Sequence, residues 1–188
     1  MLTRIAQRLV NYVLADENDN DLRAVYEYGC ELWLYTILST VALLTVGAVF
    51  HALMETAWMI IIFYACQSTG GGYHAKTHTR CFLTMLAGLL AGLLFIAVPF
   101  PHFVYLIVAC VAASVLWTYP LYLHPNKQYL ADQRKVLIRK SRYITAGCLL
   151  VTALLNFAGY INMVHAGCAA LALTALSRLY ALANAHQK

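Results

Sequence analysis

The chain has 188 residues, of which 62% are hydrophobic and 11% are charged, and its formal net charge at pH 7 is +5. Soluble domains usually carry about 25% charged residues, so this composition excludes an ordinary soluble domain, whose surface could not be covered by so few charges. It predicts an all-α, polytopic integral membrane protein whose surface contacts membrane lipids and not nucleic acid.

The N-terminal segment, residues 1–31, predicts a short amphipathic helix. Apolar residues recur there at helical spacing beside Arg4 and Arg8; they are Leu2, Ile5, Leu9 and Val13. A basic amphipathic helix of this kind lies in the membrane interface, here on the cytoplasmic side, although packing against the other helices would explain the same pattern. An acidic run from Asp16 to Asp21 follows at once, so we do not expect a secretory signal peptide.

Long intervals without charged residues predict about six transmembrane helices. A hydrocarbon core of about 30 Å requires roughly 20 apolar residues per helix. The charge-free intervals place these helices near residues 32–49, 53–68, 82–98, 103–123, 144–157 and 163–183. Gly88 and Gly92 form a small-xxx-small pair in the third of them, a pattern that serves close helix packing within one bundle or between two copies of a chain.

The basic residues predict the orientation in the membrane. All 13 Lys and Arg residues fall before the first span, between the second and third, between the fourth and fifth, or at the C-terminal end. With six spans these four segments share one side, and by the positive-inside rule that side is the cytoplasm. Both termini, the segment 67–81 and a basic loop at 124–143 are therefore expected there. Arg178 lies within the last span, and we expect its long side chain to reach the nearby interface.

Residues 67–81, between the second and third spans, carry the polar groups that favour a functional site. Three consecutive glycines, Gly70 to Gly72, are costly inside a helix, so we expect the second span to break there. Irregular backbone at membrane depth is tolerated only where protein or a wet cavity surrounds it. Because His, Lys, Thr, Arg and Cys side chains follow the break, a half-buried polar pocket is expected.

Cysteine and histidine chemistry is the sharpest interpretation of this segment. The positive charges of Arg80 and Lys76 favour the thiolate of Cys81, which is the nucleophilic form. If residues 74–81 are helical, His74 and His78 share one face with Cys81, and either could act as the base. A Cys–His pair is the general device for acyl transfer through a thioester. The other five cysteines lie in or beside predicted spans and are expected to be apolar fillers.

Two other interpretations of the segment remain open at this point. His74, His78 and Cys81 are acceptable zinc ligands, but the segment has no carboxylate, and Lys76 and Arg80 would repel a cation. We therefore expect no metal and no cofactor. The three side chains could also have structural or incidental roles, because a cysteine and a histidine at this spacing often arise by chance.

The residues Gly71-Gly72-Tyr73-His74-Ala75, followed by Cys81, resemble the motif of the accessory gene regulator protein B (AgrB) family. The segment from Tyr26 to Glu31 resembles the Tyr-Gly region of that family, and the basic segment from His124 to Arg142 resembles its cytoplasmic basic loop. The similarity runs along most of the chain, which we interpret as one AgrB-like membrane domain over residues 1–188.

The resemblance implies a bacterial cell-membrane cysteine endopeptidase that processes the precursor of a cyclic quorum-sensing peptide. It implies that Cys81 is the nucleophile, that His74 is its general base and that His78 is a bystander. The implied partners are an AgrD-like precursor peptide, membrane lipids and a second copy of the chain in a homodimer. The implied reaction is cleavage through a thioester, followed in such proteins by closure of a thiolactone ring.

The remaining site residues are assigned supporting roles. Gln67 stands where the family carries an arginine; its amide can donate to an oxyanion but brings no charge. Gly71 and Gly72 are expected to set the loop geometry, and Lys76 and Arg80 to bind substrate. The alternative function is a small non-enzymatic transporter or export permease for a peptide. A transporter usually shows intramembrane charges or paired repeats, and neither is evident here.

Overall fold

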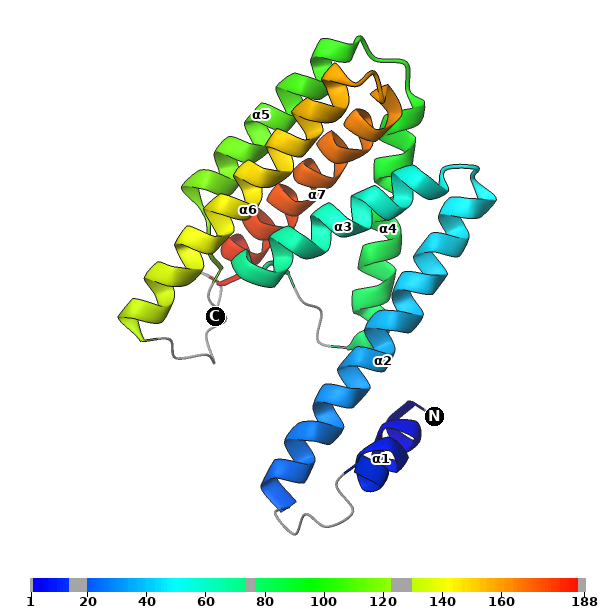
Figure 1. Ribbon diagram of the computed structural model, residues 1–188, viewed down its shortest axis with the longest axis vertical. Helices are drawn as coiled ribbons and strands as arrows, with labels where there is room; N and C mark the ends of the chain where they lie inside the picture. The colour runs from blue at the N-terminus through cyan, green and yellow to red at the C-terminus, as the bar shows by residue number, and fades with distance from the viewer. Residues whose placement is uncertain (1, 14–19, 74–76, 123–129, 186–188) are drawn as a thin grey trace. The chain divides into compact units, whose positions relative to one another are not determined.

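The computed structural model describes residues 2–13, 20–73, 77–122 and 130–185, and within these ranges the chain forms seven α-helices and no strand (Figure 1). The helices are α1 (Leu2–Val13), α2 (Asn20–Val49), α3 (Leu53–Gly70), α4 (His78–Ala97), α5 (His102–Thr118), α6 (Ala131–Phe157) and α7 (Ile161–Ala185). The all-α prediction is therefore confirmed. The chain divides into two compact units, residues 1–46 and residues 47–188.

In the first unit, α1 packs on the N-terminal part of α2. Ala6 and Val10 of α1 are buried. Three side-chain hydrogen bonds join the helices: Thr3 Oγ1 to Glu31 Oε1 (2.9 Å), Gln7 Nε2 to Glu27 Oε2 (3.5 Å) and Arg23 Nη2 to Asn11 Oδ1 (2.7 Å). The predicted helix is present, and its buried residues are not those that the sequence pattern singles out. Ile5, Leu9 and Val13 remain exposed, so their contact with a membrane interface stays a prediction.

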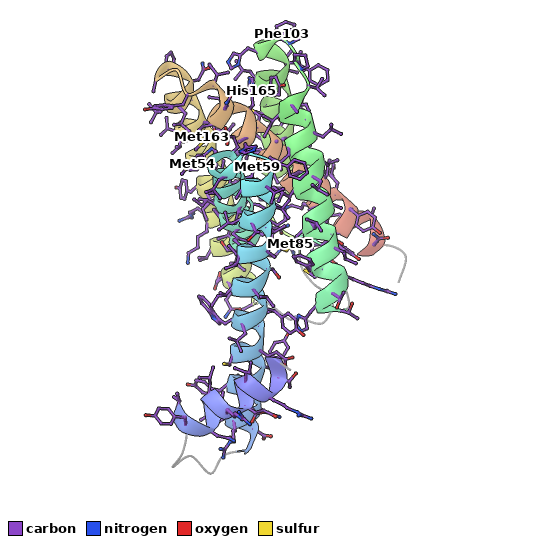
Figure 2. All side chains as sticks on the ribbon, turned by 90° about the vertical axis from the view of Figure 1, so that its right-hand side faces the viewer. Met54, Met59, Met85, Phe103, Met163 and His165 are labelled. Carbon is purple, nitrogen blue, oxygen red and sulfur yellow. The ribbon has the colours of Figure 1, made fainter. Side chains whose placement is uncertain are left out.

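In the second unit, α7 is the central helix and contacts α3, α4, α5 and α6 (Figure 1). Its buried residues are mostly small, which lets neighbouring backbones approach closely; they include Ala166, Cys168, Ala169, Ala170 and Ala175. Gly88 and Gly92 also permit close packing of α4 inside this bundle. A Cβ on Gly92 would overlap the methyl group of Met59 on α3 (Met59 is labelled in Figure 2), and one on Gly88 would touch Leu173 of α7.

The outward faces of the helices are apolar. Large exposed side chains occur on α4, α5 and α6, among them Leu83, Leu94, Ile107, Val111, Leu150 and Leu154. Soluble monomers rarely expose so much contiguous apolar surface, so these faces are suited to lipid. Within the described ranges, three helical segments are long and apolar enough to cross a membrane, namely 21–49, 78–97 and 161–184, and α5 is a shorter apolar helix. The protein is thus an all-helical membrane protein; the count of six spans and their orientation stay predictions.

Helices α2, α4 and α6 begin earlier than the spans predicted from residues 32, 82 and 144, and α5 ends at Thr118, before the predicted residue 123. The early end of α5 follows from Pro120, because the residue before a proline is disfavoured in a helix. α2 starts at Asn20 and α6 at Ala131, so most of the segment expected as a basic loop at 124–143 is helical. Lysine, arginine, alanine, glutamine and leucine all have high helix propensity, and nothing in residues 131–143 breaks a helix. Charge patterning locates the end of an apolar span correctly but does not locate the end of the helix that contains it.

Candidate functional site

The glycine run ends α3, as the sequence predicts. Gly70 is the last helical residue, and Gly71 follows with φ +66°, a conformation that L side chains rarely adopt. The N–H of Gly71 donates to Gln67 O (3.0 Å), and the N–H of Tyr122 donates to Gly70 O (2.8 Å). A Cβ on Gly71 would also lie 2.9 Å from Tyr122 O. The chain therefore turns sharply at Gly71, held against the segment that follows α5.

The side chain of Gln67 lies under this turn. Its Nε2 donates to Ser177 Oγ of α7 (3.0 Å), and the backbone N–H of Tyr73 donates to the same oxygen (3.2 Å). Gly72 is buried against the amide of Gln67, with no room for a Cβ. Gln67 Oε1 is buried and has no hydrogen-bond partner within the described ranges. In this structure the donor that the sequence assigns to an oxyanion is directed at Ser177.

The nucleophile candidate lies at the start of α4. Thr77 is the N-cap residue, with extended backbone angles (φ −130°, ψ 148°), and its hydroxyl oxygen accepts from the N–H of Arg80 (3.3 Å). Cys81 lies in the first turn, half-buried, with its N–H bonded to Thr77 O (3.0 Å). The condition that residues 74–81 form one continuous helix is therefore not met at Thr77, so the helical register that depends on it does not apply. A capping threonine requires non-helical backbone angles, which interrupts that register.

Other predicted site residues are only partly placed. Arg80 is exposed on the first turn of α4. His74 and Lys76 lie outside the described residues, so the contact between His74 and Cys81 and the role of Lys76 stay predictions. The alternative interpretation of His74, His78 and Cys81 as zinc ligands is untested for the same reason.

Arg178 corrects one expectation. Its side chain is 0% exposed and does not reach the interface. Nη1 donates to Tyr119 O (3.2 Å), Pro120 O (3.0 Å) and Ser141 Oγ (3.4 Å), and Nη2 donates to Cys66 O (3.1 Å). These oxygens belong to α3, to α6 and to the end of α5. The long arginine side chain turns into the bundle, where backbone carbonyls near the C-terminal ends of α3 and α5 lie within its reach.

Sequence reasoning missed the contribution of α7 to the site. Ser177 and Tyr180 contact the segment after α3: Ser177 as described above, and Tyr180 through an edge-to-face contact with Tyr73 (5.0 Å between ring centroids). A serine or tyrosine in an apolar span carries no local signal of such a role. A charged residue within a span does carry such a signal, because it is a functional candidate by default. Arg178 carries this signal, but the sequence pattern alone favours a position at the interface for its side chain.

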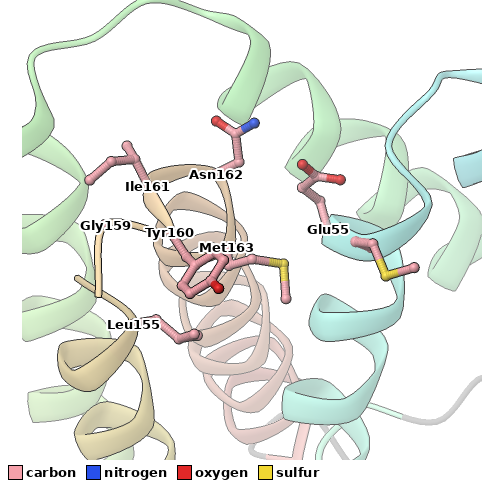
Figure 3. A pocket seen from close by; sticks show the side chains of 8 residues that line it. Glu55, Leu155, Gly159, Tyr160, Ile161, Asn162 and Met163 are labelled. Carbon is pink, nitrogen blue, oxygen red and sulfur yellow. The ribbon is translucent and has the colours of Figure 1, made fainter. Parts of the chain in front are cut away.

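A cavity of about 610 Å³ lies away from these residues (Figure 3). The first turn of α3 and the turn between α6 and α7 line it, with Glu55, Tyr160, Asn162 and Met163 among its residues. Glu55 lies in the first turn of α3, whereas Gln67 and Gly70 lie in its last turn. The cavity and residues 67–73 therefore lie at opposite ends of α3.

Comparison with known proteins identifies the family. The model of the family described as accessory gene regulator B matches residues 3–178, which include all of residues 67–81. No curated protein and no solved structure matches the chain significantly. Because the family match covers far more than half of the chain, and includes the glycine turn and the capped helix that carries Cys81, this protein belongs to the accessory gene regulator B family.

Proposed function

We propose that the protein is a membrane-embedded cysteine endopeptidase that cleaves an AgrD-type propeptide, the substrate class that the accessory gene regulator B role implies. Cys81 is the nucleophile and His74 is the general base. The observation that carries the proposal is the family match across residues 3–178, which contain the Gly71-Gly72-Tyr73-His74-Ala75 motif and Cys81. The protein acts in the bacterial cell membrane, with the segment 67–81 and both termini on the cytoplasmic side.

The position of Cys81 supports a role in nucleophilic attack. The residue is half-buried in the first turn of α4, where the helix dipole is positive and stabilises nearby negative charge. A thiol attacks as its anion. Arg80 adds a positive charge beside it in the sequence and, with Lys76, is assigned to binding the propeptide.

The reaction is two successive acyl transfers. His74 takes the proton of Cys81, and the sulfur attacks the scissile carbonyl carbon. The C–N bond breaks, His74 returns the proton to the leaving amine, and the C-terminal fragment departs, which leaves a thioester on Cys81. A cysteine thiol within the bound peptide, or water, then attacks the thioester carbonyl. His74 takes the proton of that thiol or water, the C–S bond to Cys81 breaks, and the proton passes to the departing sulfur, which regenerates the Cys81 thiol. Attack by the peptide thiol closes a thiolactone ring.

The test is cleavage of an AgrD-type propeptide by the purified protein in lipid. Cys81→Ala and His74→Ala should each abolish cleavage, because they remove the nucleophile and the base. Cys110→Ala, on the exposed face of α5, is the matched cysteine control, and His78→Ala is the matched histidine control. Both controls should cleave like wild type, and a chelator should have no effect. Mass spectrometry should detect a wild-type adduct that hydroxylamine releases, as expected for a thioester.

Other results would overturn the assignment. Cleavage by Cys81→Ala at the wild-type rate would exclude the thioester route. Loss of activity in His78→Ala, with activity retained in His74→Ala, would identify His78 and not His74 as the general base. Transport of the intact propeptide into sealed vesicles, with no cleavage by any variant, would favour the export permease.

A further inference from the structure

The buried guanidinium of Arg178 is held by neutral oxygens. Within the described residues its acceptors are three backbone carbonyls and the hydroxyl of Ser141, and no carboxylate is among them. A buried charge is costly unless its surroundings replace the water it has lost. Here the carbonyls of Tyr119 and Pro120 follow the end of α5, and that of Cys66 belongs to the last turns of α3. Both helix ends carry partial negative charge, so two converging C-terminal ends stabilise the cation.

The same guanidinium sets where α3 can end. Gly70 packs directly on it, and a Cβ at Gly70 would overlap Nη2 of Arg178. Gly70 O meanwhile accepts the N–H of Tyr122. Gly70 is therefore fixed from two sides, by Arg178 of α7 and by the segment after α5. The left-handed turn at Gly71 starts from this fixed point.

Ser177 and Tyr180 fix the residues that follow. Ser177 Oγ accepts both from Gln67 Nε2, before the turn, and from the N–H of Tyr73, after it. The ring of Tyr180 lies edge-on to that of Tyr73. One helix, α7, thus holds the chain from Gln67 through Tyr73, and Tyr73 directly precedes His74 in the sequence.

We infer that Ser177 and Arg178 are positioning residues: they fix the path from α3 to Tyr73 and so set where His74 stands relative to Cys81. This inference rests on the proposed roles of those two residues. Neither Ser177 nor Arg178 needs to touch the substrate. Misplacement of a catalytic group by about 1 Å can lower a rate on the order of 100-fold, so the loss of either contact should be visible in catalysis.

Two substitutions test the inference, one at the Ser177 hydrogen bonds and one at the contact between Gly70 and Arg178. Ser177→Ala removes the oxygen shared by Gln67 and Tyr73, and Gly70→Ala displaces the guanidinium without altering α7. Each should lower kcat roughly 10- to 100-fold with little change in KM. Ser114→Ala and Gly147→Ala are the matched controls, because the Ser114 hydroxyl bonds only its own helix and a Cβ at Gly147 meets nothing within 4 Å. Both controls should keep wild-type kcat. Ser177→Thr retains the hydroxyl and should recover most of the activity.

Two readouts separate the inference from the proposed function, because neither requires a substrate. Hydrogen exchange at residues 67–73 should become faster in Ser177→Ala and Gly70→Ala, while α5 and α6 keep their protection. The pH dependence of Cys81 alkylation, followed on the peptide that contains Cys81, should move in both variants toward that of His74→Ala. Exchange as slow as in wild type, or a wild-type alkylation profile, would overturn the positioning role even if cleavage is observed. Absence of cleavage in wild type, with both readouts as expected, would overturn only the proposed reaction.

Discussion

The three consecutive glycines at the end of α3 have three different physical roles. Gly70 leaves room for the guanidinium of Arg178, Gly71 adopts a positive φ, and Gly72 leaves room for the amide of Gln67. Only the second role depends on backbone freedom; the other two depend on the missing Cβ. An alanine at each position would therefore fail for a different reason, and the three substitutions can be distinguished by experiment.

Gly71→Ala should destabilise the protein through both strain and contact. Gly71 has φ +66° and ψ −175°, a region adopted essentially by glycine alone, where another residue costs about 1–3 kcal/mol. The new Cβ would also lie 2.9 Å from Tyr122 O. Gly159→Ala is the matched control, because Gly159 has φ +82° but nothing within 4 Å of an added Cβ. Thermal unfolding in detergent should show a larger decrease in midpoint for Gly71→Ala than for Gly159→Ala. Equal decreases would mean that Tyr122 moves away without cost.

At the scale of the helix, α7 supports both ends of the second unit. Ser177 and Arg178 contact the segment that precedes His74. His165 lies more than three turns nearer the start of the helix and belongs to a polar cluster (His165 is labelled in Figure 2). There His102 Nε2 lies 2.8 Å from Asn156 Oδ1 and His102 Nδ1 lies 3.1 Å from His165 Nε2. The tautomer of His102 that carries its hydrogen on Nε2 donates to Asn156 Oδ1 and accepts from His165 at Nδ1. The His165 ring stacks on Tyr105 at 3.6 Å. The cluster joins the start of α5, the end of α6 and α7.

Asn156→Leu should destabilise this cluster without affecting catalysis. The substitution removes the oxygen that lies 2.8 Å from His102 Nε2. An unsatisfied buried donor costs about 1–3 kcal/mol, and because His102 is only half-buried we expect the lower end of that range. Asn184→Leu is the control, since the Asn184 amide bonds only the backbone of its own helix, at Tyr180 O. Thermal unfolding should show a lower midpoint for Asn156→Leu than for the control, and kcat for the propeptide should stay at the wild-type value. A midpoint equal to that of the control would show that the histidine pair finds another acceptor.

At the scale of the whole molecule, the sequence predicts the helices well because lipid imposes a simple rule. Each predicted span corresponds to one of the helices α2 to α7, and the amphipathic pattern at residues 1–31 corresponds to α1. The lengths differ: at Asn20 and Ala131 polar residues continue a helix beyond its apolar part, and α5 ends at Thr118, before Pro120 and short of the predicted residue 123. Apolar patterning indicates which helical residues contact lipid or the core, whereas the residue at which a helix ends depends on capping and helix-breaking residues.

The site was less predictable, since it combines segments far apart in the sequence. The break at Gly71 and the position of Cys81 after it follow from local chemistry. The hydrogen bonds from Gln67 and Tyr73 to Ser177 join residues more than 100 positions apart, and no local pattern indicates them. Arg178 was visible as a charge within a span, but its carbonyl partners are brought together only by the packing of α3, α5 and α6 on α7.

Membrane topology is the last property of the whole molecule that follows from the charges, and it can be tested residue by residue. If six helices span the membrane, the turns between α2 and α3, α4 and α5, and α6 and α7 face outward. In a variant whose native cysteines are replaced, Ala52→Cys, Phe100→Cys and Ala158→Cys should react with a membrane-impermeant maleimide in intact cells. Ala131→Cys, exposed at the start of α6, should react only after permeabilisation. Every basic residue other than Arg178, which is buried in the bundle, lies in the four segments assigned to the cytoplasm. Labelling of Ala131→Cys in intact cells would therefore reverse the orientation. Labelling of only some outer turns would lower the number of spans, and the segment that carries Cys81 would then need a new assignment of its side of the membrane.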